Sequence, residues 1–288
     1  MIGNNAMLVD LNMPIGTARK MDKKVSEEVD NAKGTHARGG NYHKNLLAGS
    51  DKLERIQKIA TAARTWHYER TLPWTDKGAR LLPMKIFFEY KQTLNNFEIQ
   101  FNQAVEEFCV EYPQLVSKAA FTLNDLFDRE EYPDVEKVRT KFAFRYSFSP
   151  VPEAGDFRVD VEESALKELR DQYESHYTSK LNDAMKDAWD RLHGVLSHLS
   201  ERLVFEEEKY DTNGKKVKRS PFHASNITNV TELCELLTKL NVTDDPKLEE
   251  ARKKVEIALA GVDADDVKDS QEVRESVKAK VDAILDMF

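Results

Sequence analysis

The 288-residue chain has only two cysteines, Cys109 and Cys234. Both lie in stretches with helical apolar spacing, where buried reduced thiols are more common than disulfides or nucleophiles. No apolar run approaches the roughly 20 residues that cross a bilayer. The start of the chain, Met1–Leu11, lacks the basic and apolar regions of a signal peptide. These absences predict a cytoplasmic protein that does not enter a membrane.

Catalytic motifs are missing as well. The sequence contains no Cys-x-x-Cys pair, no Gly-x-Ser-x-Gly elbow, no His-Glu-x-x-His arrangement and no dinucleotide-binding fingerprint. The pair Gly39-Gly40 lacks the Gly-Lys-Ser/Thr ending of a phosphate-binding loop. We therefore predict that the protein is not an enzyme and needs no cofactor.

One row of side chains has the composition of a metal site. Asp183, Asp187, Asp190 and His193 recur at helical spacings of three and four, so they share one side of a helix. No second helix offers the Glu-x-x-His partner that such sites use in helical bundles. We interpret the row as a charged, solvated face, and we rank a metal-dependent enzyme last among the possible functions.

Apolar residues at intervals of three and four predict a mainly α-helical protein, a helical bundle with one very long helix. That helix should exceed thirty residues within Glu162–Glu208. It either braces the fold, forms a hairpin or provides the seam of a homo-oligomer. We expect Asp22 to cap the first of the shorter helices and Pro113 to break the third. These helices are expected over Lys23–Ala32, Ser50 to just before Pro73, Pro83–Tyr112, Gln114–Phe127, Asn229–Leu240, Lys247–Ala260 and Ser270–Met287.

A small antiparallel sheet should complete the fold. Alternating apolar residues predict strands over Met7–Thr17, Phe142–Phe148 and Phe157–Val161, the last two paired and joined by the first. Between Thr35 and Lys44 we expect a flexible basic loop. Tyr210–Phe222 reads as an exposed hairpin or loop. We expect two domains, 1–160 with the basic segment 33–91, and 161–288 with the long helix and a helical hairpin.

Charge is unevenly distributed along the chain. Lys33–Lys91 holds twelve Lys/Arg against five Asp/Glu, a net charge of +7, whereas the other residues sum to −15. Cations and aromatic rings together can bind phosphates and stack on bases. Trp66 and Trp74 equally suit buried packing, which is the commoner place for large aromatic rings. The candidate residues for binding nucleic acid or a protein partner are Arg38, Tyr42, His43, Lys44, Arg64, Trp66, His67, Tyr68, Arg70 and Trp74, with Arg19 and Lys20 beside them.

Several motifs carry a family resemblance. They are Tyr42-His43-Lys44-Asn45-Leu46-Leu47, Ala62-Ala63-Arg64-Thr65-Trp66-His67-Tyr68, residues 71–83 (TLPWTDKGARLLP), Phe148-Ser149-Pro150-Val151-Pro152 and Ala154-Gly155-Asp156-Phe157-Arg158-Val159. From about Leu8 to Leu259 the chain resembles an uncharacterised family of tailed phages and integrative elements, a domain of unknown function. Such genes tend to lie near those of a MoxR-type AAA+ ATPase and a von Willebrand A-like protein. The resemblance implies a protein partner in the host cytoplasm, and no catalytic residues.

Two functions are therefore expected. The first is a non-enzymatic adaptor or component of a MoxR-type ATPase system, favoured by the acidic helical C-terminal half. The alternative is a protein that binds single-stranded nucleic acid in phage replication or recombination, favoured by the basic segment and its aromatic rings.

Overall fold

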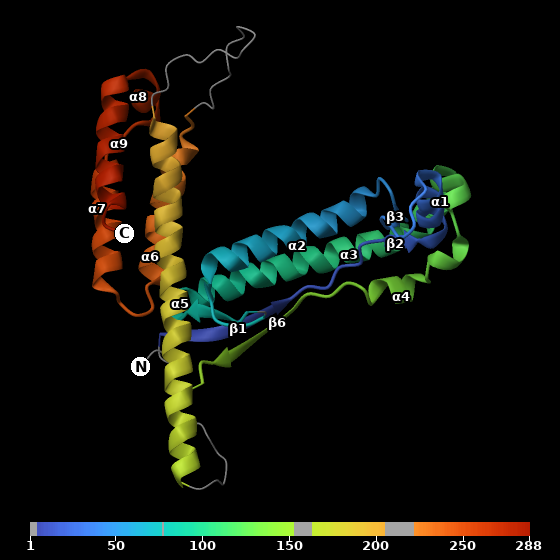
Figure 1. Cartoon of the computed structure of the whole chain (residues 1–288), viewed down its shortest axis with the longest axis horizontal. Coiled ribbons are helices and arrows are strands. Elements are labelled where there is room, and N and C mark those ends of the chain that lie inside the picture. The colour runs from blue at the N-terminus through green and yellow to red at the C-terminus, as the bar shows by residue number, and fades with distance from the viewer. Residues whose placement is uncertain (1–4, 77, 153–162, 205–221) are drawn as a thin grey trace. The chain divides into compact units, whose positions relative to one another are not determined.

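The computed structural model describes residues 5–76, 78–152, 163–204 and 222–288 (Figure 1). It is mainly α-helical, with one very long helix and a small antiparallel sheet, which confirms the predicted fold class. The chain forms two compact units that alternate along the sequence. The domain boundary expected at residue 160 lies outside the described residues. Unit 1 holds Met1–Asp10, Tyr68–Phe87 and Phe148–Phe288, and unit 2 holds Leu11–His67 and Phe88–Ser147.

Unit 2 is built on two antiparallel helices that lie side by side, α2 and α3 (Figure 1). Near one end of the pair Lys52 on α2 meets Glu107 on α3, and near the other Trp66 stacks on Tyr90. The elements that belong wholly or mainly to this unit are β2 (Arg19–Asp22), α1 (Lys23–Lys33), β3 (Tyr42–Asn45), α2 (Asp51–Arg70), α3 (Phe87–Leu123), the 3-10 turns Asn124–Leu126 and Arg129–Glu131, and α4 (Val135–Arg139).

Helix α1 begins and ends where the sequence predicted. The carboxylate of Asp22 accepts a hydrogen bond from the backbone N–H of Val25 at 3.1 Å, which satisfies one of the unpaired donors of the first turn. Gly34 ends the helix at φ 64°, a left-handed conformation that glycine adopts without steric cost.

Helix α3 corrects one prediction, because it continues through Pro113 instead of breaking there. A proline inside a helix loses a backbone hydrogen bond and crowds the preceding turn. Pro113 lies on the exposed side, however, and Val116 and Ala119 beyond it are buried together with Phe108. The free energy gained by burying these apolar side chains outweighs the cost of the backbone hydrogen bond that is lost at Pro113. The helix expected over Gln114–Phe127 is therefore the last part of α3 and the turn that follows it.

Two further segments of unit 2 differ from expectation. The segment expected to be a flexible basic loop ends in β3, which pairs with β2 in the register Lys20↔Lys44 and Met21↔His43. Phe142 and Phe144 were expected in a strand but precede β6. They are buried against Phe108 and Phe101 of α3 instead, with ring centroids 5.5 and 5.7 Å apart.

The sheet has the strand order β4-β5-β1-β6, and the pairings of β1 and β4 with β5 are antiparallel. Strand β1 ends at Asn12, before Pro14, so the strand expected to reach Thr17 is shorter. The expected strand Phe157–Val161 lies outside the described residues, and the described neighbour of β6 is β1. The strands are β1 (Ala6–Asn12), β4 (Leu72–Pro73), β5 (Arg80–Pro83) and β6 (Arg145–Pro150), with a 3-10 turn at Met84–Ile86.

The remaining helices of unit 1 pack around α5 (Glu163–Leu203), the predicted long helix, which spans 41 residues. It contacts α6 and α9, while α7 contacts both of those helices (Figure 1). Leu192, Leu196, Leu199 and Leu203 of α5 are fully buried in this core. From Ala184 onward, the apolar side chains of the long helix therefore pack against other side chains of the same unit. The other helices are α6 (Ser225–Leu240), α7 (Pro246–Leu259), α8 (Ala264–Asp269) and α9 (Gln271–Leu285).

Among the described residues, no helix has the length and apolar character that crossing a membrane requires. The expected exposed hairpin or loop over Tyr210–Phe222 lies outside the described residues, except for Phe222, which is buried.

Candidate interaction surface

The predicted binding residues fall into two groups, one in each unit. Tyr68, Arg70 and Trp74 belong to unit 1. The unit 2 group consists of Arg38, Tyr42, His43, Lys44, Arg64, Trp66 and His67.

Lys44 is buried in unit 2, with 5 % of its side chain exposed. Its ammonium lies 2.7 Å from a carboxylate oxygen of Glu131 and 3.2 Å from one of Asp22, and it donates to the carbonyl of Leu126 at 2.9 Å. Burial opposes the charged form, but hydrogen bonds and charge from Glu131 and Asp22 outweigh it and raise the pKa of Lys44. Lys44 therefore serves as an internal cation of the fold.

Three other candidates lie on the surface near the β2–β3 ribbon. The Arg38 guanidinium lies 3.5 Å from Glu27 and 3.9 Å from Asp30 on α1, so it forms exposed ion pairs within the unit. The ring of Tyr42 is 40 % exposed. His43 is exposed as well, with Nδ1 3.3 Å from the carbonyl of Asn41. Tyr42 and His43 are thus the rings of this group that are most exposed to solvent.

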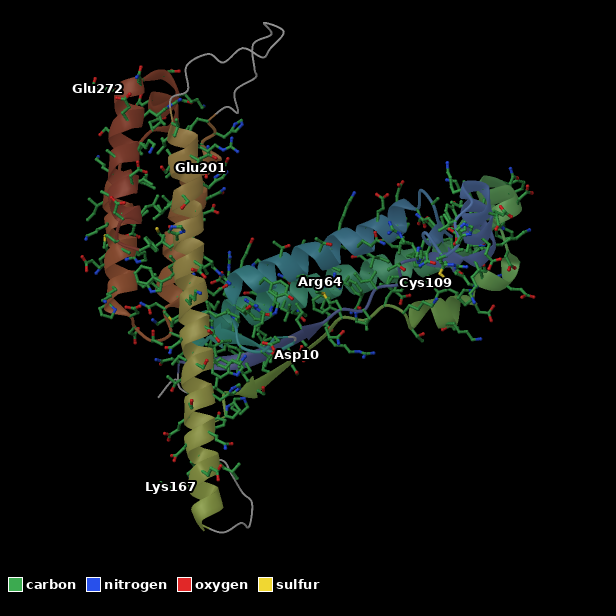
Figure 2. The ribbon with its side chains drawn as sticks, viewed as in Figure 1. Asp10, Arg64, Cys109, Lys167, Glu201 and Glu272 are labelled. Atoms are coloured by element: carbon green, nitrogen blue, oxygen red, sulfur yellow. The ribbon has the colours of Figure 1, made fainter. Side chains whose placement is uncertain are left out.

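Trp66 and His67 lie on the face of α2 that meets α3. Trp66 is half-buried and stacks on Tyr90, with ring centroids 4.9 Å apart and planes 27° apart. His67 is buried, and its Nδ1 lies 2.6 Å from the Tyr90 hydroxyl. Arg64 on α2 (Figure 2) donates to the carbonyl of Met13 at 2.5 Å. These side chains hold α2 against α3 and against the chain that follows β1.

The unit 1 group anchors the β4–β5 pair. Trp74 is 9 % exposed and packs edge-on against Tyr177 of α5, with centroids 5.5 Å apart. The Arg80 guanidinium lies 4.7 Å from the centre of the Tyr68 ring and donates to Thr71. Arg70 is half-buried, 3.7 Å from the carboxylate of Glu69. Burial of Trp74 agrees with the packing interpretation of that residue.

The structure adds Arg191, which the sequence did not single out. It donates to the carbonyls of Tyr68 at 3.0 Å, Glu69 at 2.7 Å and Thr71 at 2.9 Å, where α2 ends and its last carbonyls need donors. Asp187 holds the guanidinium at 2.7 Å. No local pattern could reveal this role, because the partners lie about 120 residues apart in the sequence.

The row of α5 side chains that was considered as a metal site lies next to Arg191. Asp183, Asp190 and His193 are exposed, and Asp187 is paired with Arg191. His193 also packs edge-on against Phe288, with centroids 5.3 Å apart. Across the described ranges, no three His, Cys, Asp or Glu side chains are grouped so as to hold a metal ion.

The basic segment finds much of its counter-charge inside the molecule. Lys52 lies 3.2 Å from Glu107 and 3.4 Å from Glu111, and Arg55 lies 2.6 Å from Glu107. The hydrogen bond from Lys52 is the main cause of a lowered Glu107 pKa. Glu54 and Glu69 of the segment pair with Lys58 and Arg70. The other acids that pair with it come from outside: Asp22, Glu27, Asp30, Glu107, Glu111, Glu131 and, in unit 1, Asp244. Much of the positive charge that is segregated along the sequence is therefore ion-paired in the fold.

Helix α3 exposes a row of large apolar side chains, Phe88, Ile99, Val110 and Phe121, referred to below as the α3 row. Their exposed fractions are 83, 57, 78 and 84 %. The row was missed because the core face of the same helix is also apolar, although the constant interval of eleven residues is visible in the sequence.

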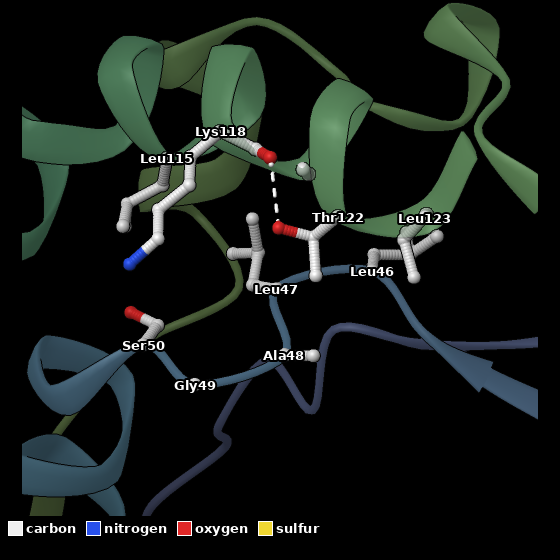
Figure 3. A pocket seen from close by; sticks show the side chains of 10 residues that line it. Leu46, Leu47, Ala48, Gly49, Ser50, Leu115, Lys118, Thr122 and Leu123 are labelled. Atoms are coloured by element: carbon white, nitrogen blue, oxygen red, sulfur yellow. Dashed lines mark hydrogen bonds between the residues drawn. The ribbon is translucent and has the colours of Figure 1, made fainter.

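A small cavity lies between the β3–α2 loop and the C-terminal part of α3 (Figure 3). Thr122 donates to the carbonyl of Lys118 at 3.0 Å beside it, and the Lys118 ammonium points toward Ser50. Apolar side chains make up most of the wall. The lining residues are Leu46, Leu47, Ala48, Gly49, Ser50, Leu115, Lys118, Ala119, Thr122 and Leu123.

Comparisons of the chain with protein-family models, with curated proteins and with solved structures give no match. The resemblance noted in the sequence motifs stays a prediction, and the proposals below rest on it and on the contacts described above.

Proposed function

We propose that the protein is a non-enzymatic, phage-encoded interaction protein, an adaptor or component of a MoxR-type ATPase system in the host cytoplasm. The motif resemblance supports this through the expected gene neighbours, a MoxR-type ATPase and a von Willebrand A-like protein. The observation that carries the proposal is the internal pairing of the basic segment, with Lys44, Lys52 and Arg55 held by carboxylates of the same unit.

Internal pairing bears on the choice between the two expected functions. Binding to a nucleic acid gains free energy when cations contact phosphates and release condensed counterions. A cation that already holds a carboxylate must first give up that contact, so it adds less to binding. Lys44 is buried between two acids, and Arg38 lies against two others. The segment therefore has a smaller capacity for phosphate than its +7 charge suggests.

The C-terminal helices supply a complementary argument for a protein partner. Residues 222–288 carry nine Lys/Arg and fifteen Asp/Glu, a net charge of −6. Asp265, Asp266 and Asp269 of α8 are exposed, and Asp265 lies 2.6 Å from the ammonium of Lys268, so the excess of acids is partly paired. A surface of one sign steers a partner of opposite charge and fixes its orientation. The proposed partner surface is therefore basic.

The exposed rings of Tyr42 and His43 favour the alternative, a protein that binds single-stranded nucleic acid. Its support is narrower, because Trp66 and Trp74 are engaged with Tyr90 and Tyr177.

The adaptor proposal is tested with the purified full chain and the MoxR-type ATPase encoded nearest to it. We expect binding that survives nuclease treatment and weakens about tenfold or more in Asp265→Lys/Asp266→Lys/Asp269→Lys, since three charges of the acidic bundle are reversed. The matched control is Lys24→Glu, an exposed charge change in unit 2 that should leave the affinity unchanged. Affinities are measured by biolayer interferometry at two salt concentrations. No binding at micromolar ATPase, or binding abolished by nuclease, would contradict the proposal.

A further inference from the structure

The α3 row has a regular geometry. Phe88, Ile99, Val110 and Phe121 are each eleven residues apart, and eleven residues make about three turns of an α-helix. The four side chains therefore lie on one side of α3, about 16 Å from one to the next along its axis. The opposite side carries the core residues Leu94, Phe101, Phe108 and Val116, which are buried.

The order of the side chains is symmetric. Aromatic rings stand at both ends of the row and β-branched side chains stand in the middle. A two-fold axis across the middle of the helix would place Phe88 opposite Phe121 of a second copy, and Ile99 opposite Val110 of that copy. A patch that is complementary to itself in this way is what a two-fold interface between identical chains requires.

We propose that the α3 row is a self-association surface, on which two copies of this chain pair through antiparallel α3 helices. Apolar side chains that recur every eleven residues keep to one side of a helix, where a second helix can pack lengthwise against them. A second copy supplies such a helix with the matching spacing.

The polar residues between the apolar ones favour the antiparallel orientation. Near the centre of the row, Gln103 and Glu106 are both exposed. In the antiparallel register Gln103 of one copy lies opposite Glu106 of the other, and an amide N–H can donate to a carboxylate. One N–H of Gln103 already donates to Glu107 at 3.3 Å, which leaves a second donor. A parallel pair in register would place Gln103 opposite Gln103 and Glu106, which pairs with Arg139 of its own chain, opposite Glu106, so this amide–carboxylate contact would be lost.

The size of the row sets the strength of the expected association. With roughly 150 Å² or more for each exposed aromatic ring, the row offers roughly 500 Å² for each copy. A pair would bury about 1,000 Å², the lower limit for a specific interface. The dimer should therefore be reversible, with dissociation in the micromolar range.

Sedimentation velocity of the full chain over about 1–200 µM tests the proposal. The sedimentation coefficient of the wild type should rise with concentration toward that of a dimer. Ile99→Glu/Val110→Glu should stay monomeric over the whole range, because two pairs of like charges would face each other across the interface. Both side chains are exposed, so this variant should keep its circular dichroism spectrum and melting temperature. Ile257→Glu, at an exposed apolar position on α7, is the matched control and should dimerise as the wild type does.

Disulfide crosslinking tests the orientation. Chains with Ile99→Cys mixed with chains with Val110→Cys should form mixed disulfides faster than either variant crosslinks with itself. The native Cys109 and Cys234 are buried and should react slowly. A wild type that remains monomeric at about 200 µM, or a dimer that persists in Ile99→Glu/Val110→Glu, would overturn the proposal. Faster crosslinking of each variant with itself would overturn the antiparallel arrangement.

Discussion

Replacing Lys44 by Ala is expected to lower the free energy of unfolding by about 3–5 kcal/mol, because it leaves buried carboxylates without their cation. Glu131 and Asp22 have 11 and 14 % of their side chains exposed, so water replaces little of the lost interaction. The Leu126 carbonyl loses its donor as well. Urea unfolding followed by circular dichroism measures the loss.

Two further variants distinguish the effect of leaving a buried carboxylate unpaired from the effect of merely shortening a lysine side chain. Lys20→Ala removes another cation next to Glu131, at 3.5 Å, but Lys20 is 52 % exposed. It should cost less than about 1 kcal/mol. Adding Glu131→Gln to Lys44→Met should recover part of the loss, since the unpaired charge disappears. If Lys44→Ala and Lys20→Ala lowered the free energy of unfolding by the same small amount, the ion pairs of Lys44 with Asp22 and Glu131 would contribute little to stability.

The ion pair between Lys44 and Asp22 also makes the free energy of unfolding depend on pH. The backbone N–H of Val25 is the main cause of a lowered Asp22 pKa, with a further contribution from Lys44. A carboxyl whose folded pKa lies below its unfolded value stabilises the fold above the unfolded pKa, near 3.8. This contribution is lost as the pH falls through the folded pKa. The raised pKa of Lys44 acts at the other end, where stability is lost as the pH rises above its usual 10.5 through the folded value.

Trp74→Ala is expected to destabilise unit 1 by about 3–5 kcal/mol, the usual cost of removing a large buried ring. Trp74 belongs to the core of unit 1 and packs edge-on against Tyr177. The control is Tyr68→Ala, which removes a 53 % exposed ring and its contact with Arg80, for about 1 kcal/mol or less. Thermal unfolding compares the two. A Trp74→Ala protein as stable as the wild type would show that the ring is available for another role.

Much of the helical fold could be predicted because its signals are local. The three-and-four spacing of apolar residues predicted α5, and the cap residue Asp22 with Gly34 predicted both ends of α1. Strands β4 and β5 were missed because two and four residues are too few to show alternation. Pro113 misled the prediction because a local rule ignores the burial of Val116 and Ala119 beyond it.

The candidate site was harder to predict because its contacts join distant parts of the sequence. A count of charges finds the +7 segment but cannot show that Glu107, Glu111 and Glu131 neutralise part of it. Trp66 and Trp74 were candidate binding residues for which packing was the commoner alternative, and their rings contact Tyr90 and Tyr177. To predict the α3 row, one would have to distinguish its spacing of eleven residues from the three-and-four spacing of the buried apolar residues on the same helix.

The most direct test of the central claim, that the basic segment is largely paired within the fold, is a titration of a short labelled single strand with the full chain. Fluorescence anisotropy is recorded from about 50 to 200 mM salt, where phosphate contacts change affinity most clearly. The paired cations predict no saturable binding at about 50 mM salt and micromolar protein. Tight binding whose log K falls with log[salt] at a slope near −0.7 per phosphate contacted, and whose slope flattens in Arg38→Glu, would contradict the claim.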